Sequence, residues 1–257
     1  MQKRFENKTV IVTGASSGIG EATALRFGRE GANLVLAARS EMTDLVNRIG
    51  SDRAIAVQTD VSKEDQVEAL IGRAIECFGQ IDVLVNNAGM GLGGAPEETA
   101  TDDWRKVMSV NVDSIFYACR AAIPHLEKTG GCIVNTSSVS GIGGDWGMSP
   151  YNASKGAVTN YTRALALDLA SRGMRVNAVC PSFTKTSMTK GMEEKTELMQ
   201  RFAERLPMGR AAEPEEVASV IAFLVSDDAR YVNGVLLPVD GGLSASNGQP
   251  PLDGRFD

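Results

Sequence analysis

The chain lacks the usual sequence signs of a metal site, of disulfide bonds and of a membrane segment. Its only histidine, His125, has no cysteine at ligand spacing, so we expect no metal site. The four cysteines, Cys77, Cys119, Cys132 and Cys180, show no CxxC spacing, and we expect reduced structural thiols in a cytoplasmic protein. The N-terminus, MQKRFENKTVIVTG, runs directly into a strand, with neither a signal-peptide apolar region nor a membrane span.

An excess of basic residues is also absent. The chain has 26 lysines and arginines against 32 aspartates and glutamates, a formal net charge of −6, and its basic residues are scattered. This balance argues against a nucleic-acid or anionic-membrane surface. An apolar content of 43% and a length of 257 residues instead fit one globular domain with a sizeable core. We expect its ligand to be a small molecule.

Short β-branched runs alternate with longer amphipathic segments, without internal repeats or long polar linkers. The expected strands are Thr9–Thr13, Asn33–Ala38, Ala54–Gln58, Ile81–Asn86, Gly131–Thr136, Arg175–Cys180 and Val235–Val239. The expected helices are Ile19–Glu30, Glu41–Ile49, Lys63–Phe78, Thr101–Ser109, Val112–Lys128, Tyr151–Arg172, Glu193–Glu204 and Pro214–Val225. Strands that are apolar on both faces and alternate with helices predict an α/β fold, a single Rossmann-type doubly wound domain with about seven parallel strands.

The domain is expected to occupy residues 1–243. The remaining residues, 244–257, contain Gly248-Gln249-Pro250-Pro251 and are typical of an extended or docked arm. We expect this tail to dock on a neighbouring subunit, with Gln249 as the residue that reaches the neighbour's pocket.

The first expected strand ends in a glycine-rich turn that leads into a helix. The turn reads Thr13-Gly14-Ala15-Ser16-Ser17-Gly18-Ile19-Gly20, with GxxxGxG spacing rather than GxGxxG. Glycines allow close backbone approach, and the free N–H groups of a helix N-terminus attract a pyrophosphate. A plain tight turn is the alternative, but the position at the first βα junction favours dinucleotide binding.

The end of the second expected strand bears on which dinucleotide binds. It reads Leu36-Ala37-Ala38-Arg39-Ser40, without the carboxylate that would hold a ribose 2′-hydroxyl. Arg39 is suited to a 2′-phosphate, with a hydroxyl added by Ser40 or Ser16, and a solvated loop arginine is the alternative. We therefore expect NADP(H) to be preferred, with NAD(H) possible.

Asp60 and Val61 follow the third expected strand. The Asp60 carboxylate could accept a hydrogen bond from the adenine amino group. Its alternative role is an N-cap for the helix that begins near Lys63, where Ser62 is the better candidate.

Ser138, Tyr151 and Lys155 form the pattern with the most definite chemistry. The pKa of a tyrosine hydroxyl is about 10, which is too high for proton exchange at neutral pH. Lys155 lies one helical turn after Tyr151, so we expect its ammonium to lower the pKa of the tyrosine. A Ser138 hydroxyl at the same point would hold a substrate oxygen. The pattern predicts proton transfer on an alcohol or a carbonyl.

Together these motifs resemble the short-chain dehydrogenase/reductase family over essentially the whole chain. The matching residues are TGASSGIG at 13–20, NNAG at 86–89, Asn111, Ser138 and Tyr151-x-x-x-Lys155. The resemblance implies that Tyr151 is the catalytic acid/base, that Ser138 orients the substrate oxygen and that Lys155 binds the nicotinamide ribose. It also implies that Asn111 anchors a water linking Lys155 to solvent. Taken alone, NNAG could be a turn and Asn111 a helix breaker.

The cofactor set follows from the turn and the resemblance together. Its members are Gly14, Ser16, Ser17, Gly18, Ile19, Gly20, Arg39, Ser40, Asp60, Val61, Asn87, Ala88, Gly89, Tyr151, Lys155, Pro181, Thr184 and Thr186. The chain departs from the family at Pro181-Ser182, where Pro-Gly is usual. We expect the pocket wall near the carboxamide to differ there, while Thr184 and Thr186 still bind cofactor.

Three stretches resemble the bacterial meso-2,3-butanediol (acetoin) dehydrogenases of this family. They are HLEKTGGCIVNTSSVSGIGGDWG at 125–147, VCPSFTKTSMTKG at 179–191 and VDGGLSASNGQP at 239–250. Those enzymes use NAD and carry an acidic residue where this chain has Ala38-Arg39. The chain is therefore either an NADP-using relative or one with an altered cofactor site.

The expected function is an NADP(H)-preferring oxidoreductase that interconverts a small secondary alcohol or diol and its ketone. A 3-oxoacyl thioester reductase or a general carbonyl reductase is the alternative within the family. A dinucleotide-sensing regulatory protein is the alternative outside enzymes, although the complete set of Asn111, Ser138, Tyr151 and Lys155 speaks against it. The resemblance also implies a homotetramer, with the 112–128 and 151–172 helices pairing between subunits.

The loop between Ser138 and Tyr151 should border the substrate. The pocket residues expected there and after the sixth strand are Ser140, Asp145, Trp146, Phe183 and Met188. Trp146 would narrow the cavity and Asp145 would bond a second substrate oxygen; packing of Trp146 at a subunit face and turn capping by Asp145 are the alternatives. Phe183 and the Met188–Met192 region are expected to form a mobile lid.

Overall fold

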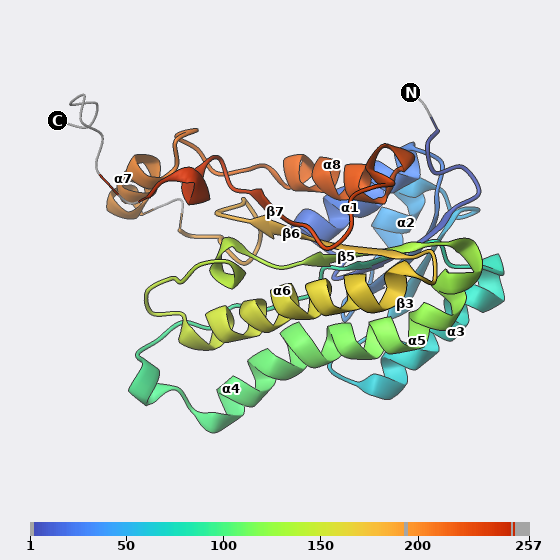
Figure 1. The fold of residues 1–257 in the computed structure, drawn as a ribbon, viewed down its shortest axis with the longest axis horizontal. Coiled ribbons are helices and arrows are strands. Elements are labelled where there is room, and N and C mark those ends of the chain that lie inside the picture. Colours follow the sequence, from blue (N-terminus) through green and yellow to red (C-terminus); the bar gives the residue numbers. More distant parts are fainter. Residues whose placement is uncertain (1–2, 193–194, 248, 250–257) are drawn as a thin grey trace.

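A parallel sheet of seven strands runs through the centre of the structure (Figure 1), a computed structural model that describes residues 3–192, 195–247 and 249. The strands are β1 (Thr9–Thr13), β2 (Asn33–Ala38), β3 (Ala54–Gln58), β4 (Val83–Asn86), β5 (Cys132–Thr136), β6 (Arg175–Pro181) and β7 (Leu236–Val239). Their spatial order is β3-β2-β1-β4-β5-β6-β7, and every neighbouring pair is parallel. The predicted seven-stranded doubly wound fold is confirmed.

Helices cover both faces of this sheet. They are α1 (Gly18–Arg29), α2 (Thr43–Ile49), α3 (Glu64–Phe78), α4 (Thr101–Met108), α5 (Ser114–Thr129), α6 (Ser149–Ala170), α7 (Thr196–Arg205) and α8 (Pro214–Val225). Figure 1 shows α1, α2 and α8 on one side and α3, α5 and α6 on the other. Within the described residues, no helix is long and apolar enough to cross a membrane.

Two hydrophobic cores follow from this layering. Val10 and Val12 of β1 pack into the core shared with α1 and α8, whereas Ile11 between them packs into the core shared with α3, α5 and α6. Successive side chains of a strand point to opposite faces, and both faces are covered here, so β1 is apolar throughout.

The strand order reverses between β1 and β4, because β1 pairs with β2 on one side and with β4 on the other. In an open parallel sheet, the carboxyl ends of the strands beside such a reversal border the ligand crevice. The glycine-rich turn follows β1, and the NNAG segment begins at the end of β4. The topology thus brings these two motifs to one crevice.

Among the helical boundaries that differ from those expected from the sequence, two lie near the site. Helix α6 begins at Ser149, so Tyr151 lies inside its first turn rather than at its start. A five-residue π-helical segment, Ser109–Asp113, joins α4 to α5 where the pattern predicted a break. The predicted start of the 193–204 helix and most of the predicted tail, at positions 248 and 250–257, lie outside the described residues.

Candidate active site

The phosphate-binding turn is tied to the NNAG segment by hydrogen bonds across the crevice. The Thr13 hydroxyl accepts the main-chain N–H groups of Asn87 at 3.0 Å and Ala88 at 3.1 Å. The Asn87 side-chain amide donates to the carbonyls of Thr13 at 3.1 Å and Gly14 at 3.3 Å. Thr13, absent from the predicted cofactor set, therefore joins the ends of β1 and β4.

The turn has the geometry that a pyrophosphate needs. A Cβ at position 20 would lie 2.1 Å from the carbonyl oxygen of Gly14, so only glycine lets α1 start this close to the turn. Ser17, which precedes α1, makes no side-chain capping bond to the helix. The Ser17 side chain therefore leaves the first N–H groups of α1 uncapped, which fits the binding of an anion at this helix end.

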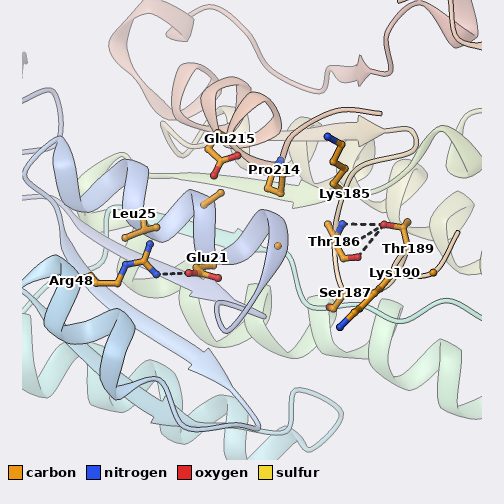
Figure 2. Close-up of a pocket in the computed structure, with 13 residues that line it drawn as sticks. Glu21, Leu25, Arg48, Lys185, Thr186, Ser187, Thr189, Lys190, Pro214 and Glu215 are labelled. Carbon is orange, nitrogen blue, oxygen red and sulfur yellow. Dashed lines mark hydrogen bonds and ion pairs between the residues drawn. The ribbon is translucent and has the colours of Figure 1, made fainter. Parts of the chain in front are cut away.

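A cavity of about 590 Å³ adjoins this turn between α1, the 185–191 segment and the start of α8 (Figure 2). It is lined by residues that include Gly18, Glu21, Arg48, Thr186 and Ser187. It meets the predicted phosphate site at Gly18 and Thr186 but contains no residue of the Ser138, Tyr151 and Lys155 set. This cavity is thus a neighbour of the cofactor crevice rather than the place of the chemistry.

Thr189 holds the 185–191 segment in place and was not singled out from the sequence. Its hydroxyl donates to the Thr184 carbonyl at 2.7 Å. The same hydroxyl accepts the N–H of Thr186 at 3.0 Å (Figure 2). The Ser187 hydroxyl lies 3.4 Å from that of Ser17 in the turn. The segment carrying Thr184 and Thr186 therefore reaches the phosphate-binding turn, as the cofactor prediction requires.

Arg39 is exposed at the end of β2 and lies near Asp60. The pKa of Asp60 is below its usual value, chiefly because the Ser62 hydroxyl bonds the carboxylate, with smaller contributions from the charges of Arg39 and Lys63. The alternative role of Asp60 or Ser62 as the N-cap of α3 is not found. Lys63 precedes α3 without a side-chain cap, and the Asp60 carboxylate instead accepts the Ser62 N–H at 3.0 Å and hydroxyl at 2.8 Å.

Ser138 lies two residues after the end of β5, in a segment that is held against α6. The Ser137 hydroxyl donates to the Lys155 carbonyl at 3.1 Å, and the Thr159 hydroxyl donates to the Gly141 carbonyl at 3.0 Å. A Cβ at position 141 would lie 2.6 Å from that same Lys155 carbonyl. Ser137, Gly141 and Thr159, which the sequence motifs did not reveal, therefore set the approach of Ser138 to Tyr151.

Lys155 is buried beneath the face of the Tyr151 ring. Its Nζ lies 5.7 Å from the ring centroid and donates a hydrogen bond to the Thr136 carbonyl at 2.8 Å. Burial lowers the pKa of Lys155 to about 8. The structure thus brings Ser138, Tyr151 and Lys155 together, as the motif spacing predicts.

The expected lowering of the Tyr151 pKa is not found. Burial raises this pKa above the usual 10, the bond with Ser138 opposes the rise, and the charge of Asp145 adds to it. The Lys155 ammonium is held by the Thr136 carbonyl and is itself disfavoured by burial. The helical spacing of the two residues therefore predicted too large a lowering of the Tyr151 pKa by Lys155.

Asn111 is fully buried in the π-helical segment between α4 and α5. Its side-chain oxygen accepts the Met90 N–H at 2.8 Å, and its amide donates to the Met90 carbonyl at 2.9 Å and the Ser154 hydroxyl at 3.0 Å. Ser154 in turn donates to the Tyr151 carbonyl at 2.7 Å. The Asn111 side chain thus connects the segment after β4 to the first turns of α6.

The loop between Ser138 and Tyr151 carries three predicted pocket residues, Ser140, Asp145 and Trp146, and the last two have different surroundings. The Asp145 carboxylate accepts a hydrogen bond from the Ser140 hydroxyl. Trp146 is 83% exposed, and the Arg205 guanidinium at the end of α7 lies 5.3 Å from its ring centroid. Trp146 therefore contacts the helix that follows the 185–191 segment.

Phe183 does not have the exposed position of a lid residue. It is buried and stacks on Phe202 of α7 at 4.7 Å, in a small cluster with Leu206 and Ala211. Phe183 thus packs the segment after β6 against α7, and its place in a mobile lid stays a prediction. Met188 is more than half exposed, and its sulfur would lie 3.7 Å from a Cβ at position 91.

Ser182 fits the backbone without a special conformation. Its N–H donates to the Val239 carbonyl at 3.3 Å, and its carbonyl accepts the Thr184 hydroxyl at 3.0 Å. The departure from Pro-Gly therefore leaves the strand pairing of β6 and β7 in place. Over residues 3–192, 195–247 and 249, no three histidine, cysteine, aspartate or glutamate side chains gather as they would around a metal ion.

Known proteins share both this sequence and this fold. A family profile described as enoyl-(acyl carrier protein) reductase matches residues 14–244. The meso-2,3-butanediol dehydrogenase of Serratia marcescens is 52% identical over 251 residues, covering 97% of this chain and 99% of that protein. The 3-oxoacyl-acyl-carrier-protein reductase of Thermotoga maritima is 39% identical over 93% of this chain and 99% of its own. The solved structure of levodione reductase superposes with a TM-score of 0.89 at 36% identity, over 95% of this chain and 100% of that one.

These similarities extend over nearly the whole chain and agree with the crevice geometry. The predicted resemblance, including that to butanediol dehydrogenases, is confirmed. The chain belongs to the short-chain dehydrogenase/reductase family and is an NAD(P)-dependent alcohol dehydrogenase or ketone reductase of that type.

Proposed function

We propose that this protein is an NADP(H)-preferring oxidoreductase that interconverts a small secondary alcohol or diol with its ketone. One observation carries the proposal: Ser138 and Tyr151 lie together above the buried Lys155. The hydrogen bond with the Ser138 hydroxyl lowers the pKa of Tyr151 against the effect of burial. Such a group suits proton exchange with a substrate oxygen. When bound, the nicotinamide supplies or accepts the hydride at the carbon.

In the direction of ketone reduction, the Tyr151 hydroxyl donates its proton to the substrate oxygen. The Ser138 hydroxyl holds that oxygen beside the tyrosine, which fixes the distance for proton transfer. Lys155 has a pKa of about 8, so it exchanges protons near neutral pH and can support reprotonation of Tyr151. Asn111 helps to hold the first turns of α6, because its amide donates to the Ser154 hydroxyl, which in turn donates to the Tyr151 carbonyl.

The preference for NADP(H) rests on the charge at the end of β2. Arg39 is exposed there, and the neighbouring strand end carries Asp60, whose carboxylate is already bonded by Ser62. A 2′-phosphate would meet the Arg39 guanidinium at this edge, whereas a bare ribose would find no carboxylate following Ala38. The hydroxyls of Ser16 and Ser40 are the added donors in this proposal.

The proposed substrate class follows the similarity to a meso-2,3-butanediol dehydrogenase at 52% identity. The similarity to a 3-oxoacyl-acyl-carrier-protein reductase at 39% identity supports a second candidate, reduction of a 3-oxoacyl thioester. Steady-state turnover on acetoin, diacetyl and a 3-oxoacyl thioester, each with NADPH and NADH, separates the two. We expect the highest kcat/KM on a four-carbon hydroxyketone or diketone with NADPH, and a preference for the thioester would overturn the first candidate.

We also propose a homotetramer in which α5 and α6 pair between subunits. Phe116 of α5 is 43% exposed and Leu167 of α6 is 80% exposed, which supports burial of these helices against another copy. The residues after 243 would dock on a neighbour, with Gln249 nearest its pocket. Light scattering tests the assembly, and a monomeric mass would exclude it.

The cysteines bear on where the protein acts. Among the described residues the four cysteines are free, and Cys119, Cys132 and Cys180 are buried. Reduced thiols of this kind support the proposed cytoplasmic location.

A further inference from the structure

Two methionine side chains meet beside Gly91, in the segment that follows β4. A Cβ placed on Gly91 would lie 3.7 Å from the Met188 sulfur and 3.9 Å from the terminal methyl carbon of Met148. Met148 immediately precedes α6, and Met188 belongs to the segment that follows β6. Three separate segments of the chain therefore converge on one apolar contact.

This contact lies beside the catalytic residues. A Cβ placed on Gly89 would lie 3.5 Å from Lys155 Nζ. Gly91 follows Gly89 by two residues, so the Cα atoms of the two glycines are at most about 7 Å apart. Met148 precedes Tyr151 by three residues, at the start of the same helix. The two methionines thus border the place where Tyr151 and Lys155 would meet a substrate.

Hydrogen bonds hold two of the three segments together. The Asn111 side chain binds both the N–H and the carbonyl of Met90, at 2.8 and 2.9 Å, which fixes the backbone just before Gly91. The Gly94 N–H donates to the Gly147 carbonyl at 2.8 Å. The segment after β4 is therefore held against the start of α6, and the segment after β6 completes the contact.

Gly91 leaves room that its backbone conformation does not require. Its φ is not in the left-handed region, so a residue with a side chain could adopt the same conformation. A methyl group at this position would have its nearest neighbour at 3.7 Å, which is ordinary van der Waals contact. The space beside the two methionines is thus large enough for a methyl group.

Neither methionine packs in the interior of the protein. Met188 is 55% exposed, and both Met148 and Met188 lie outside the three hydrophobic clusters found among the described residues. A methionine side chain is apolar, flexible and polarisable, so it adapts to apolar groups of different shape. These two side chains therefore offer apolar surface to a ligand.

We propose that Met148 and Met188, which meet at Gly91, form the apolar wall that limits the alkyl group beside the reacting carbonyl to a methyl group. The inference rests on the proposed function and narrows its substrates to ketones and secondary alcohols with a methyl group on the reacting carbon. A larger alkyl group would have to displace one of the methionines. Gly91 and Met148 thereby join Met188 as pocket residues.

The test compares diacetyl with 3,4-hexanedione, in which each terminal methyl group of diacetyl is replaced by an ethyl group. Steady-state kinetics with NADPH give kcat/KM for each diketone, and calorimetry gives its Kd for the enzyme loaded with NADP⁺. We expect the wild type to favour diacetyl by at least about tenfold, since one methylene in an apolar pocket changes kcat/KM by about 10- to 200-fold. Met148→Ala and Met188→Ala should each lower this preference by at least about fivefold, because they open the wall.

Met188→Leu is the matched control, because leucine nearly conserves the volume of the side chain, and it should keep the wild-type preference. Gly91→Ala places a methyl group in the space itself and should raise the preference for diacetyl. Because Met188 is more than half exposed, Met188→Ala should fold, and it decides the question if Met148→Ala does not. Cofactor binding by fluorescence verifies that each variant is folded.

Three results would overturn the proposal. An unchanged preference in Met188→Ala would show that this side chain does not limit the substrate. An equal loss in Met188→Leu would mean that the segment is disturbed, not that the wall is opened. A lower preference in Gly91→Ala would place the limiting space elsewhere.

Failure of the proposed function would look different. A wild-type enzyme that reduces neither diketone with NADPH or NADH would exclude the proposed activity. The ratio of the two calorimetric Kd values would still measure the wall, because binding requires no turnover.

Discussion

Lys155 Nζ donates a hydrogen bond to the main-chain carbonyl of Thr136 at 2.8 Å, which joins α6 to the last residue of β5. Because Lys155 is only 4% exposed, its charge is largely withdrawn from water. The same contact fixes the height of the Tyr151 ring above the strand end, since Nζ also lies 5.7 Å from the ring centroid.

The buried ammonium should give the protein a distinctive pH dependence of stability. Burial lowers the pKa of Lys155 from 10.5 to about 8, so between these values the unfolded chain binds a proton that the folded protein does not. The free energy of unfolding then rises with pH in this window. Lys155→Met removes the effect, so its stability relative to wild type should fall by about 2 to 3 kcal/mol from about pH 7 to about pH 10. Urea unfolding of both proteins measures this, and a difference independent of pH would contradict the burial argument.

Tyr151→Phe should remove proton transfer while preserving the fold. The phenyl ring keeps the packing above Lys155, but no hydroxyl remains to exchange a proton with the substrate. We expect kcat to fall by at least about 100-fold, with cofactor affinity nearly unchanged. Steady-state kinetics and cofactor fluorescence measure the two quantities. Retained turnover would mean that another group is the acid/base.

Arg39→Asp should move the cofactor preference from NADP to NAD. The substitution exchanges a partner of a 2′-phosphate for an acceptor of a ribose 2′-hydroxyl. We expect the ratio of kcat/KM for NADPH to that for NADH to fall by at least about tenfold. Arg73→Asp is the control for the change of charge, because Arg73 lies on α3 and pairs with Glu76 at the surface. The assignment of Arg39 would be lost if both variants kept the wild-type ratio.

Gly141→Ala should disturb the site through the backbone. Its Cβ would lie 2.6 Å from both the Lys155 carbonyl and the Ser137 hydroxyl, so the segment carrying Ser138 must move away from α6. We expect a loss of about 1 to 3 kcal/mol in unfolding free energy, together with a lower kcat. Gly72→Ala on α3 is the control, since nothing lies within 4 Å of its Cβ, and it should stabilise by about 1 kcal/mol. A neutral Gly141→Ala would show that the two backbones have room to separate.

Much of the architecture could be read from local patterns. The strands Thr9–Thr13 and Asn33–Ala38 coincide with β1 and β2, because runs that are apolar on both faces are typical of buried parallel strands. The edge strand β3 also coincides with its expected range, Ala54–Gln58. The π-helical segment around Asn111 could not be read in this way. Its extra residue per turn is stabilised by the contacts of Asn111 with Met90 and Ser154, which are distant in sequence.

Some residues of the candidate site could likewise be predicted from local patterns, whereas others depend on tertiary contacts. Ser138, Tyr151 and Lys155 were found because their chemistry and spacing are visible in the chain. Ser137, Gly141 and Thr159 were missed because their role depends on how closely the end of β5 approaches α6. The stacking of Phe183 on Phe202 was missed for the same reason, since it is a contact between separate segments.

The fold class, the order of the elements and the residue types that carry the chemistry could be predicted from the chain alone, because periodicity and motif spacing are local properties. The electrostatic state of the site depends instead on the folded arrangement. Burial raises the pKa of Tyr151 and lowers that of Lys155, and the Asp145 carboxylate reaches Ser140 across a folded loop. Desolvation and through-space charge depend on what surrounds a group in three dimensions, which no spacing along the chain specifies.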